Sequence, residues 1–285
     1  MTNIANSPTQ KIIFRNQNIY IKRDDLLHSD FTGNKARKFY YFFKKDFPNI
    51  KKIISHGSNQ SNAMYSLSVL AKLKGWKFDY YTDHIPTFLE ENPQGNYKYA
   101  LENNMNLKLG KYPIKTDDTT LFISEGGAIL EASYGIEILA NEIVQWRDEN
   151  NITNLKVFLP SGTGTTALFL QKYLDDEVLT TPCVGDCKYL KQQFLELEDD
   201  TKNHPTIIAP PKKFHFGKLY EENYLIWKEL NKQTNIEFDL LYDPIGWQTL
   251  LTQEFKDTTI LYIHQGGQKG NETMKTRYKR KLGII

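Results

Sequence analysis

Short apolar runs typical of strands alternate with longer amphipathic runs along this sequence, and the alternation constrains the fold more than any other feature. The predicted strands cover residues 19–26, 50–55, 77–82, 107–109, 120–123, 155–159, 178–183, 238–241 and 260–264. The predicted helices cover residues 35–45, 63–74, 93–104, 129–149, 217–233 and 247–255, with one more running from the 161–166 loop to 173. Strands that alternate with helices form βαβ units and parallel sheets. The sequence therefore predicts an α/β protein.

The number of βαβ units exceeds what one simple sheet holds. The chain has 285 residues, enough for one large or two medium domains. Residues 147–151 are all polar and interrupt the pattern. We therefore expect two α/β domains with a cleft between them.

The charge balance argues against several classes of protein. The net charge is +2, and no basic block is long enough to indicate a nucleic-acid binder. No apolar run approaches the roughly 18 residues of a membrane-spanning helix. The N-terminal residues lack the pattern of a signal peptide, so we expect a cytoplasmic protein.

The cysteines do not indicate a disulfide framework, and the histidines do not indicate a metal centre. The two cysteines, Cys183 and Cys187, are too few for a disulfide framework and are more typical of buried small apolar residues. The six histidines do not pair with cysteine or carboxylate at metal-ligand spacing, so no metal site is predicted.

Lys35 follows Gly33 and Asn34, a chain breaker and a good helix N-cap residue. It therefore lies in the first turn of a predicted helix, where the positive end of the helix dipole lowers the pKa of an ammonium group. A lysine with a lowered pKa is a better imine-forming nucleophile. The alternative is a surface lysine on a basic helix.

Two further loops lie between a strand and a helix, at the strand ends where parallel sheets bind ligands. The loop from Ser161 to Thr166 combines Gly162 and Gly164 with the hydroxyls of Thr163, Thr165 and Thr166. Glycines let an anion approach the backbone, and the next helix offers free N–H groups. Both nucleotide fingerprints are absent, so a small phosphomonoester fits best. The alternative is an ordinary capped turn.

The second loop contains Ser58, Asn59, Gln60, Ser61 and Asn62, which can hydrogen-bond a planar polar ligand. Its alternative is a helix-capping cluster. A primary amine, a polar loop and a phosphate cradle together describe a pyridoxal-phosphate site.

At this point the sequence resembles a known family. The segments 22–26, 33–38, 57–62, 125–128 and 161–164 resemble, in order and spacing, the 1-aminocyclopropane-1-carboxylate deaminase/D-cysteine desulfhydrase family of fold type II pyridoxal-phosphate enzymes. The resemblance extends from about Ile19 to about Gly267. It implies two three-layer αβα domains with mainly parallel sheets and pyridoxal 5'-phosphate in the cleft. The large domain would hold residues 1–37 and 151–285, and the small domain residues 38–150.

The resemblance also implies roles for individual residues. Lys35 matches the lysine that holds the cofactor as a Schiff base and moves the α-proton. Asn62 matches the residue at the cofactor's phenolic oxygen, and the Ser161–Thr166 loop matches the phosphate cradle. Ser61 matches a catalytic serine near the substrate carboxylate, with Asn59 and Gln60 beside it. A small amino-acid substrate and a homodimer are implied as well.

The sequence departs from the family near its C-terminal end. Relatives often read Asp-Pro-Val-Tyr followed by Glu or Thr, where this sequence has Asp243-Pro244-Ile245-Gly246-Trp247. Gly246 then replaces a tyrosine that faces the substrate, and Trp247 replaces the residue whose carboxylate contacts the pyridine nitrogen in the deaminases. Gln265 also stands where relatives often have threonine.

These departures favour one reaction over another. Opening a cyclopropane ring has no α-proton to start from and needs both missing groups, whereas β-elimination from D-cysteine asks less of the ring nitrogen. We therefore expect a D-cysteine desulfhydrase-like enzyme that releases pyruvate, ammonia and sulfide. The alternatives are a 1-aminocyclopropane-1-carboxylate deaminase and a catalytically silent relative that binds cofactor or amino acid as a sensor.

Overall fold

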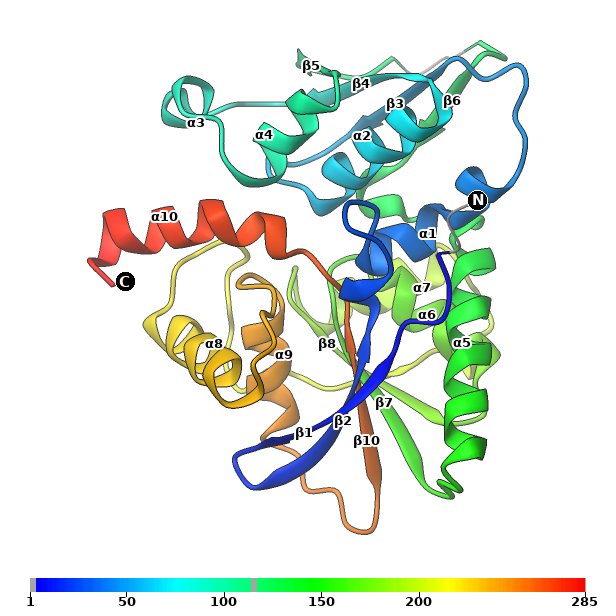
Figure 1. The fold of residues 1–285 in the computed structure, drawn as a ribbon, viewed down its shortest axis with the longest axis vertical. Coiled ribbons are helices and arrows are strands. Elements are labelled where there is room, and N and C mark those ends of the chain that lie inside the picture. The colour runs from blue at the N-terminus through cyan, green and yellow to red at the C-terminus, as the bar shows by residue number, and fades with distance from the viewer. Residues whose placement is uncertain (1–3, 114–116, 285) are drawn as a thin grey trace.

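The computed structural model describes residues 4–113 and 117–284, and it contains two separate sheets (Figure 1). The larger sheet has the strand order β1-β2-β10-β7-β8-β9, and the smaller sheet has the order β5-β4-β3-β6. Strand β1 is antiparallel to β2, and the other pairs are parallel. The predicted α/β class with mainly parallel sheets is therefore confirmed.

Most of the predicted strands and helices are present, but the helix predicted at 217–233 begins four residues later and that predicted at 247–255 begins four residues earlier. Strands at Thr9–Phe14 and Thr206–Ile207 and helices at Thr87–Glu91 and Cys187–Leu195 were not predicted. The larger sheet contains β1 (Thr9–Phe14), β2 (Gln17–Arg23), β7 (Leu155–Ser161), β8 (Glu177–Pro182), β9 (Thr206–Ile207) and β10 (Thr259–His264). The smaller sheet contains β3 (Lys52–His56), β4 (Lys77–Thr82), β5 (Met105–Leu109) and β6 (Thr120–Ile123). The helices are α1 (Gly33–Lys44), α2 (Asn62–Lys74), α3 (Thr87–Glu91), α4 (Gly95–Glu102), α5 (Ala132–Glu149), α6 (Thr165–Tyr173), α7 (Cys187–Leu195), α8 (Glu221–Thr234), α9 (Asp243–Leu250) and α10 (Asn271–Leu282). None of the described helices is both long and apolar enough to cross a bilayer.

The larger sheet is covered on both faces. One hydrophobic cluster joins β1, β2 and β10 to α8 and α9, and a second joins β7 and β10 to α5 and α6. In the smaller sheet, β4 alternates buried residues such as Phe78 and Tyr80 with more exposed ones, and α2 and α4 pack against it. Apolar burial on this scale is the main stabilising term of such domains.

The helix α5 packs differently from the expected domain division, which places residues 38–150 together. Its buried residues Ile136, Leu139 and Ile143 belong to the cluster on the larger sheet, and Gly135 lies against the carbonyl of Arg37 in α1. The polar segment 147–151 ends a helix of the larger sheet rather than a domain. We therefore propose that the large domain also includes α5.

A buried network of charges fixes α1 between the two sheets. The Arg37 guanidinium donates to Asp24 at 2.8 Å and to Glu142 of α5 at 2.6 Å, and Lys22 of β2 lies 2.8 Å from the same Glu142. All four side chains are almost completely buried. Buried charges are tolerated only when paired in this way, so the network holds the start of α1 in one place.

The predicted strand at 238–241 is wrong, because this segment has no regular secondary structure. Side chains instead of a neighbouring strand accept from its backbone N–H groups: Asp243 accepts from Asp239, Asn271 accepts from Leu240, and Asp239 accepts from Leu241. Every buried backbone donor needs a partner, and here carboxylates and an amide supply it. The apolar residues of this segment therefore reflect its burial, and the hydrogen bonds from its polar neighbours determine the backbone conformation.

Candidate active site

A cavity of about 860 Å³ lies between the two sheets and is lined from both. All of the predicted site residues line it: Lys35, Asn59, Gln60, Ser61, Asn62, Gly162, Thr163, Gly164, Thr165 and Thr166. They come from α1, from the β3–α2 connection and from the β7–α6 connection. Because the carboxyl ends of parallel strands meet at one edge of a sheet, three segments far apart in the sequence face one cavity.

Helix α1 begins two residues earlier than predicted. Thr32 occupies the N-cap position, and Asn34 lies inside the helix, where its amide donates to the Gln265 side chain at 2.9 Å. Gly33 has a φ of +67°, and a Cβ there would lie 2.0 Å from the Gln265 carbonyl oxygen. Asn34 is therefore not the cap, and glycine is required because β10's end approaches the helix start so closely.

Lys35 and Lys38 lie on the same side of α1 and point to one acceptor. The Nζ atoms donate to the Gly126 carbonyl at 3.2 Å and 3.0 Å respectively, and Lys38 Nζ also lies 3.4 Å from Thr163 Oγ1. Within the described part of the chain, neither lysine forms an ion pair. Two cations without a carboxylate partner make this end of the cavity suitable for an anion.

Burial lowers the pKa of Lys35 to about 8. The pKa of Lys38 lies well below its usual value because of burial and, second, the positive charge of Lys35. The sequence predicted a lowered pKa from the helix dipole, but desolvation is the dominant cause. A neutral Lys35 amine is therefore accessible near neutral pH, as a nucleophile or base requires.

We expect the ligand-free protein to become more stable as the pH rises from about 8 to 10.5. In this window the unfolded chain still protonates Lys35 while the folded chain holds the neutral amine, so the unfolded state binds more protons and the free energy of unfolding rises. The gain attributable to Lys35 is up to about 3 kcal/mol. Urea unfolding of the wild type and of Lys35→Met across this range measures it, and equal slopes for both proteins would refute the assignment.

The Ser161–Thr166 loop has the features of an anion cradle. Gly164 has a φ of +74° at the start of α6, and a Cβ there would lie 2.4 Å from Phe194. The hydroxyls of Thr163 and Thr165 are 3.0 Å apart, and the buried Thr166 Oγ1 has no hydrogen-bond partner in the described structure. The first N–H groups of α6 are also free for a ligand. With Lys38 beside it, this set of donors fits a phosphate group.

The polar loop after β3 both caps a helix and lines the cavity, the two roles that were predicted as alternatives. The Ser61 hydroxyl caps α2 by accepting from the N–H groups of Ala63 at 3.1 Å and Met64 at 3.4 Å. The Gln60 amide donates to Gln94, and the Asn59 amide donates to His84. All three residues still line the cavity, so this loop is held rigidly in front of it.

Asn62 connects this loop to the buried acids across the cavity. Its side-chain oxygen accepts from Asn96 at 2.6 Å, and its amide hydrogen-bonds Asp239. Burial raises the pKa of Asp239 to about 6, although the N–H groups of Tyr242 and Leu241 oppose the shift.

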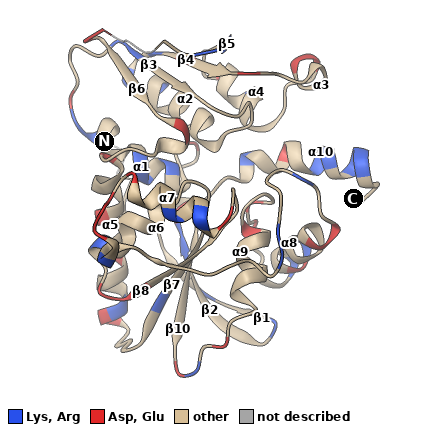
Figure 2. Cartoon of the chain, turned by 180° about the vertical axis from the view of Figure 1, so that it is seen from behind, with Lys and Arg blue, Asp and Glu red and all other residues tan. Residues whose placement is uncertain are grey.

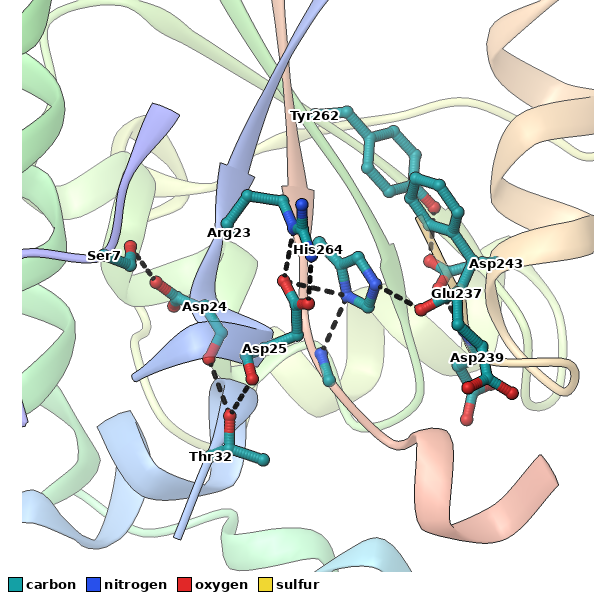
Figure 3. A network of polar contacts seen from close by, with 12 residues as sticks. Ser7, Arg23, Asp24, Asp25, Thr32, Glu237, Asp239, Asp243, Tyr262 and His264 are labelled. Atoms are coloured by element: carbon teal, nitrogen blue, oxygen red, sulfur yellow. Dashed lines mark hydrogen bonds and ion pairs between the residues drawn. The ribbon is translucent and has the colours of Figure 1, made fainter. Parts of the chain in front are cut away.

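Tyr242 and Asp243 both line the cavity. From the sequence, Tyr242 could supply a phenol only by turning inward, and neither residue was selected for the site. Asp243 accepts from the Tyr262 hydroxyl at 2.6 Å (Figure 3), and burial together with the charge of Asp239 raises its pKa. Tyr242 stays a neutral phenol because burial raises its pKa too, and its hydroxyl forms no hydrogen bond within the described residues. This phenol is therefore free to meet a ligand.

The expectation that Gly246 and Trp247 stand at the cavity is wrong. Trp247 is fully buried, with its ring 4.6 Å from that of Tyr262, and neither residue lines the cavity. Gly246 is required by packing, because a Cβ would lie 2.8 Å from the Tyr262 hydroxyl.

The motif lies four residues earlier than the Asp-Pro dipeptide suggested. In the relatives' pattern, a tyrosine follows an aspartate by three residues and an acid often comes next. The same spacing occurs in Asp239-Leu240-Leu241-Tyr242-Asp243. This segment faces the cavity, which is the position that the sequence analysis gave to Gly246 and Trp247. The spacing alone offers this register beside that of the Asp-Pro dipeptide, and the position of the cavity identifies it.

Behind the cavity, His264 joins the ends of β2 and β10 to the 237–242 segment (Figure 3). Its Nδ1 accepts from the Gly266 N–H at 3.1 Å, so Nε2 carries the proton and donates to the Glu237 carbonyl at 2.9 Å. Burial lowers the pKa of His264, which keeps it neutral. The nearby Asp25 is instead paired with Arg23 at 2.7 Å. We infer that this group positions the site and does not exchange protons.

No protein-family model matches the sequence, and no curated protein matches it significantly. Solved structures do match. A structure described as an ACC deaminase homologue has a TM-score of 0.78 at 19% identity, over 98% of this chain and 94% of its own. A hydrogen sulfide-producing enzyme from Fusobacterium nucleatum has a TM-score of 0.67 at 13% identity, over 93% and 97%. O-acetylserine sulfhydrylase isoform 3 from Entamoeba histolytica has a TM-score of 0.66 at 12% identity, over 99% and 90%.

Identities this low establish the fold alone. The agreement extends over nearly the whole of each chain, so it includes both sheets. The predicted two-domain architecture is thereby confirmed. This chain has the fold of the fold type II pyridoxal-phosphate enzymes.

Proposed function

We propose that this protein is a pyridoxal-phosphate-dependent lyase or deaminase that acts on a small amino acid, with β-elimination from D-cysteine or a similar compound as its reaction. One observation carries the proposal: the buried Lys38 and the partly buried Lys35, neither with an acid partner, lie beside a phosphate-type loop in a cavity between two α/β domains. The fold agrees, and the similar structures include a hydrogen sulfide-producing enzyme and a diaminopropionate ammonia lyase.

Pyridoxal phosphate, when bound, would supply an aldehyde for amines and a ring that withdraws electrons. The residues present fit it. The free donors of the Ser161–Thr166 loop and Lys38 would hold the phosphate, and Lys35 would hold the aldehyde carbon. Asn62, already hydrogen-bonded to Asn96 and Asp239, would face the ring.

The remaining polar residues would bind and move protons on the substrate. Asn59, Gln60 and Ser61, held at the start of α2, would bind the substrate carboxylate. Lys35, with a pKa of about 8, would take the α-proton once its amine is free. A thiolate then leaves from the β-carbon without further help.

Ring opening of 1-aminocyclopropane-1-carboxylate is a second candidate, because Tyr242 and Asp243 line the cavity. The argument against it rested on Gly246 and Trp247, which lie away from the cavity. The alternative of a catalytically silent sensor was also based on Gly246 and Trp247. It loses that basis, because the side chains of Tyr242 and Asp243 line the cavity instead.

A substrate panel tests the proposal. We expect protein loaded with pyridoxal phosphate to release pyruvate and ammonia from at least one small β-substituted amino acid, in the D or L series. Release of 2-oxobutanoate from the cyclopropane would favour the second candidate. An absence of any oxo acid, with an amino-acid-induced change in the visible spectrum, would instead identify a binding protein.

Replacing Lys38 by methionine is expected to weaken the binding of pyridoxal phosphate by about 10- to 100-fold, because a charge-assisted hydrogen bond to phosphate is lost. The binding of pyridoxal, which has no phosphate, should change little. Titrating both compounds into the two proteins measures the difference. An equal loss for pyridoxal would place the Lys38 effect outside the phosphate subsite.

A further inference from the structure

Residues of α10 line one end of the cavity, and Lys and Arg recur along this helix (Figure 2). The cavity-lining residues of this helix recur at the spacing of one helical face: Thr273, Met274, Thr276, Arg277, Arg280 and Lys281. We propose that this end binds a negatively charged group at the far end of the substrate's side chain. The substrate class would then be small amino acids that carry a phosphate, sulfonate or carboxylate on the side chain. The inference rests on the proposed function.

Arg277 is half-buried and lacks an acidic partner. Its guanidinium donates to the Gly217 carbonyl at 2.6 Å and to the Met274 sulfur at 3.2 Å, which leaves three of its five N–H donors. No ion pair involves it within the described residues, and burial lowers its pKa. A partly buried guanidinium without a carboxylate gains most from an anion that enters the cavity.

Arg280 is held over the cavity mouth by the small domain. Its guanidinium carbon lies 3.6 Å from the ring centroid of Phe88 in α3, a cation–π contact across the gap between the domains. Stacking on a ring leaves the N–H groups at the guanidinium edge free for bidentate bonds to phosphate or carboxylate. No acid pairs with Arg280 or Lys281 in the part of the chain that the structure describes.

The acids that line the cavity do not neutralise this end. Asp239 and Asp243 accept hydrogen bonds inside the buried network, and Glu125 lies against Gly57 near the loop that contacts Lys38. The cavity therefore has two cationic ends, one at Lys38 and one at α10. Its volume of about 860 Å³ lies in the upper part of the range of roughly 300–1,000 Å³ that is usual for ligand sites, so a side chain longer than that of cysteine has room.

Two serine esters that differ in charge test the proposal on protein loaded with pyridoxal phosphate. O-phosphoserine and O-acetylserine, each in both configurations, differ in charge at the far end. Binding is read from the ester concentration that raises the thermal midpoint, and turnover is read from pyruvate. We expect Arg280→Gln to lower the preference for the phosphate ester over the acetate ester by about 10- to 100-fold in binding. Arg280→Lys should retain part of it.

Lys279→Gln is the matched control, because Lys279 is an exposed cation of the same helix that does not line the cavity. Equal preferences in the wild type, Arg280→Gln and Lys279→Gln would overturn the proposal, even if pyruvate appears and the proposed function holds. A preference that Arg280→Gln removes, without pyruvate from any ester, would support the anion subsite and contradict the lyase function.

Discussion

Replacing Lys35 by alanine is expected to abolish catalysis, with a fall in kcat of at least about 10³-fold. The residue has two functions in the proposed reaction, since its amine holds the cofactor aldehyde and later takes the α-proton. Lys38 is not expected to replace it, because its Nζ lies 3.4 Å from Thr163 Oγ1, at the phosphate end of the cavity. Pyridoxal phosphate should still bind to the variant, but without a covalent bond.

Borohydride reduction followed by peptide mapping measures this directly. In the wild type the pyridoxyl group should be found on Lys35. In Lys35→Ala the amount of labelled lysine should be far below the amount of bound cofactor. Lys269 offers a matched control, since its ammonium stacks on Tyr99 at 4.3 Å and its replacement should leave the label in place. A label on Lys38 in the wild type would reverse the assignment of the two lysines.

Replacing Tyr242 by phenylalanine should separate the two candidate reactions. Ring opening needs a group that attacks or protonates a ring carbon, and the Tyr242 hydroxyl is a neutral phenol at the cavity without an internal hydrogen bond. Removing one such placed donor commonly costs about 10²- to 10³-fold in rate. Elimination of a thiolate does not need the phenol, so that rate should fall by less than about tenfold.

The measurement is kcat/KM for D-cysteine and for 1-aminocyclopropane-1-carboxylate on each protein preparation. Tyr189→Phe is the control, because Tyr189 also lines the cavity but lies at its exposed side. Equal losses for both substrates in Tyr242→Phe would mean that the hydroxyl acts on a step common to both reactions. An unchanged cyclopropane rate would exclude Tyr242 from ring opening.

The local pattern of the sequence was sufficient for most elements and for three of the site's segments. Period, turn residues and helix signals act over a few residues, so β6, α2 and the loop after β7 could be recognised without knowledge of their neighbours. The spacing of Lys35, the 58–62 loop and the 161–166 loop at strand ends also predicted that they would share one cavity, since parallel strands end at the same edge.

Only the tertiary structure determined which C-terminal residues belong to the site. Phe238 to Leu241 are apolar enough for a strand, but the carboxylates of Asp239 and Asp243 and the amide of Asn271 bind the backbone N–H groups there. That irregular turn directs Tyr242 into the cavity and places Trp247 in the core. The two carboxylate bonds are local, but the Leu240–Asn271 bond joins residues 31 positions apart and has no local signature. The sequence motif alone therefore did not identify which residues enter the cavity.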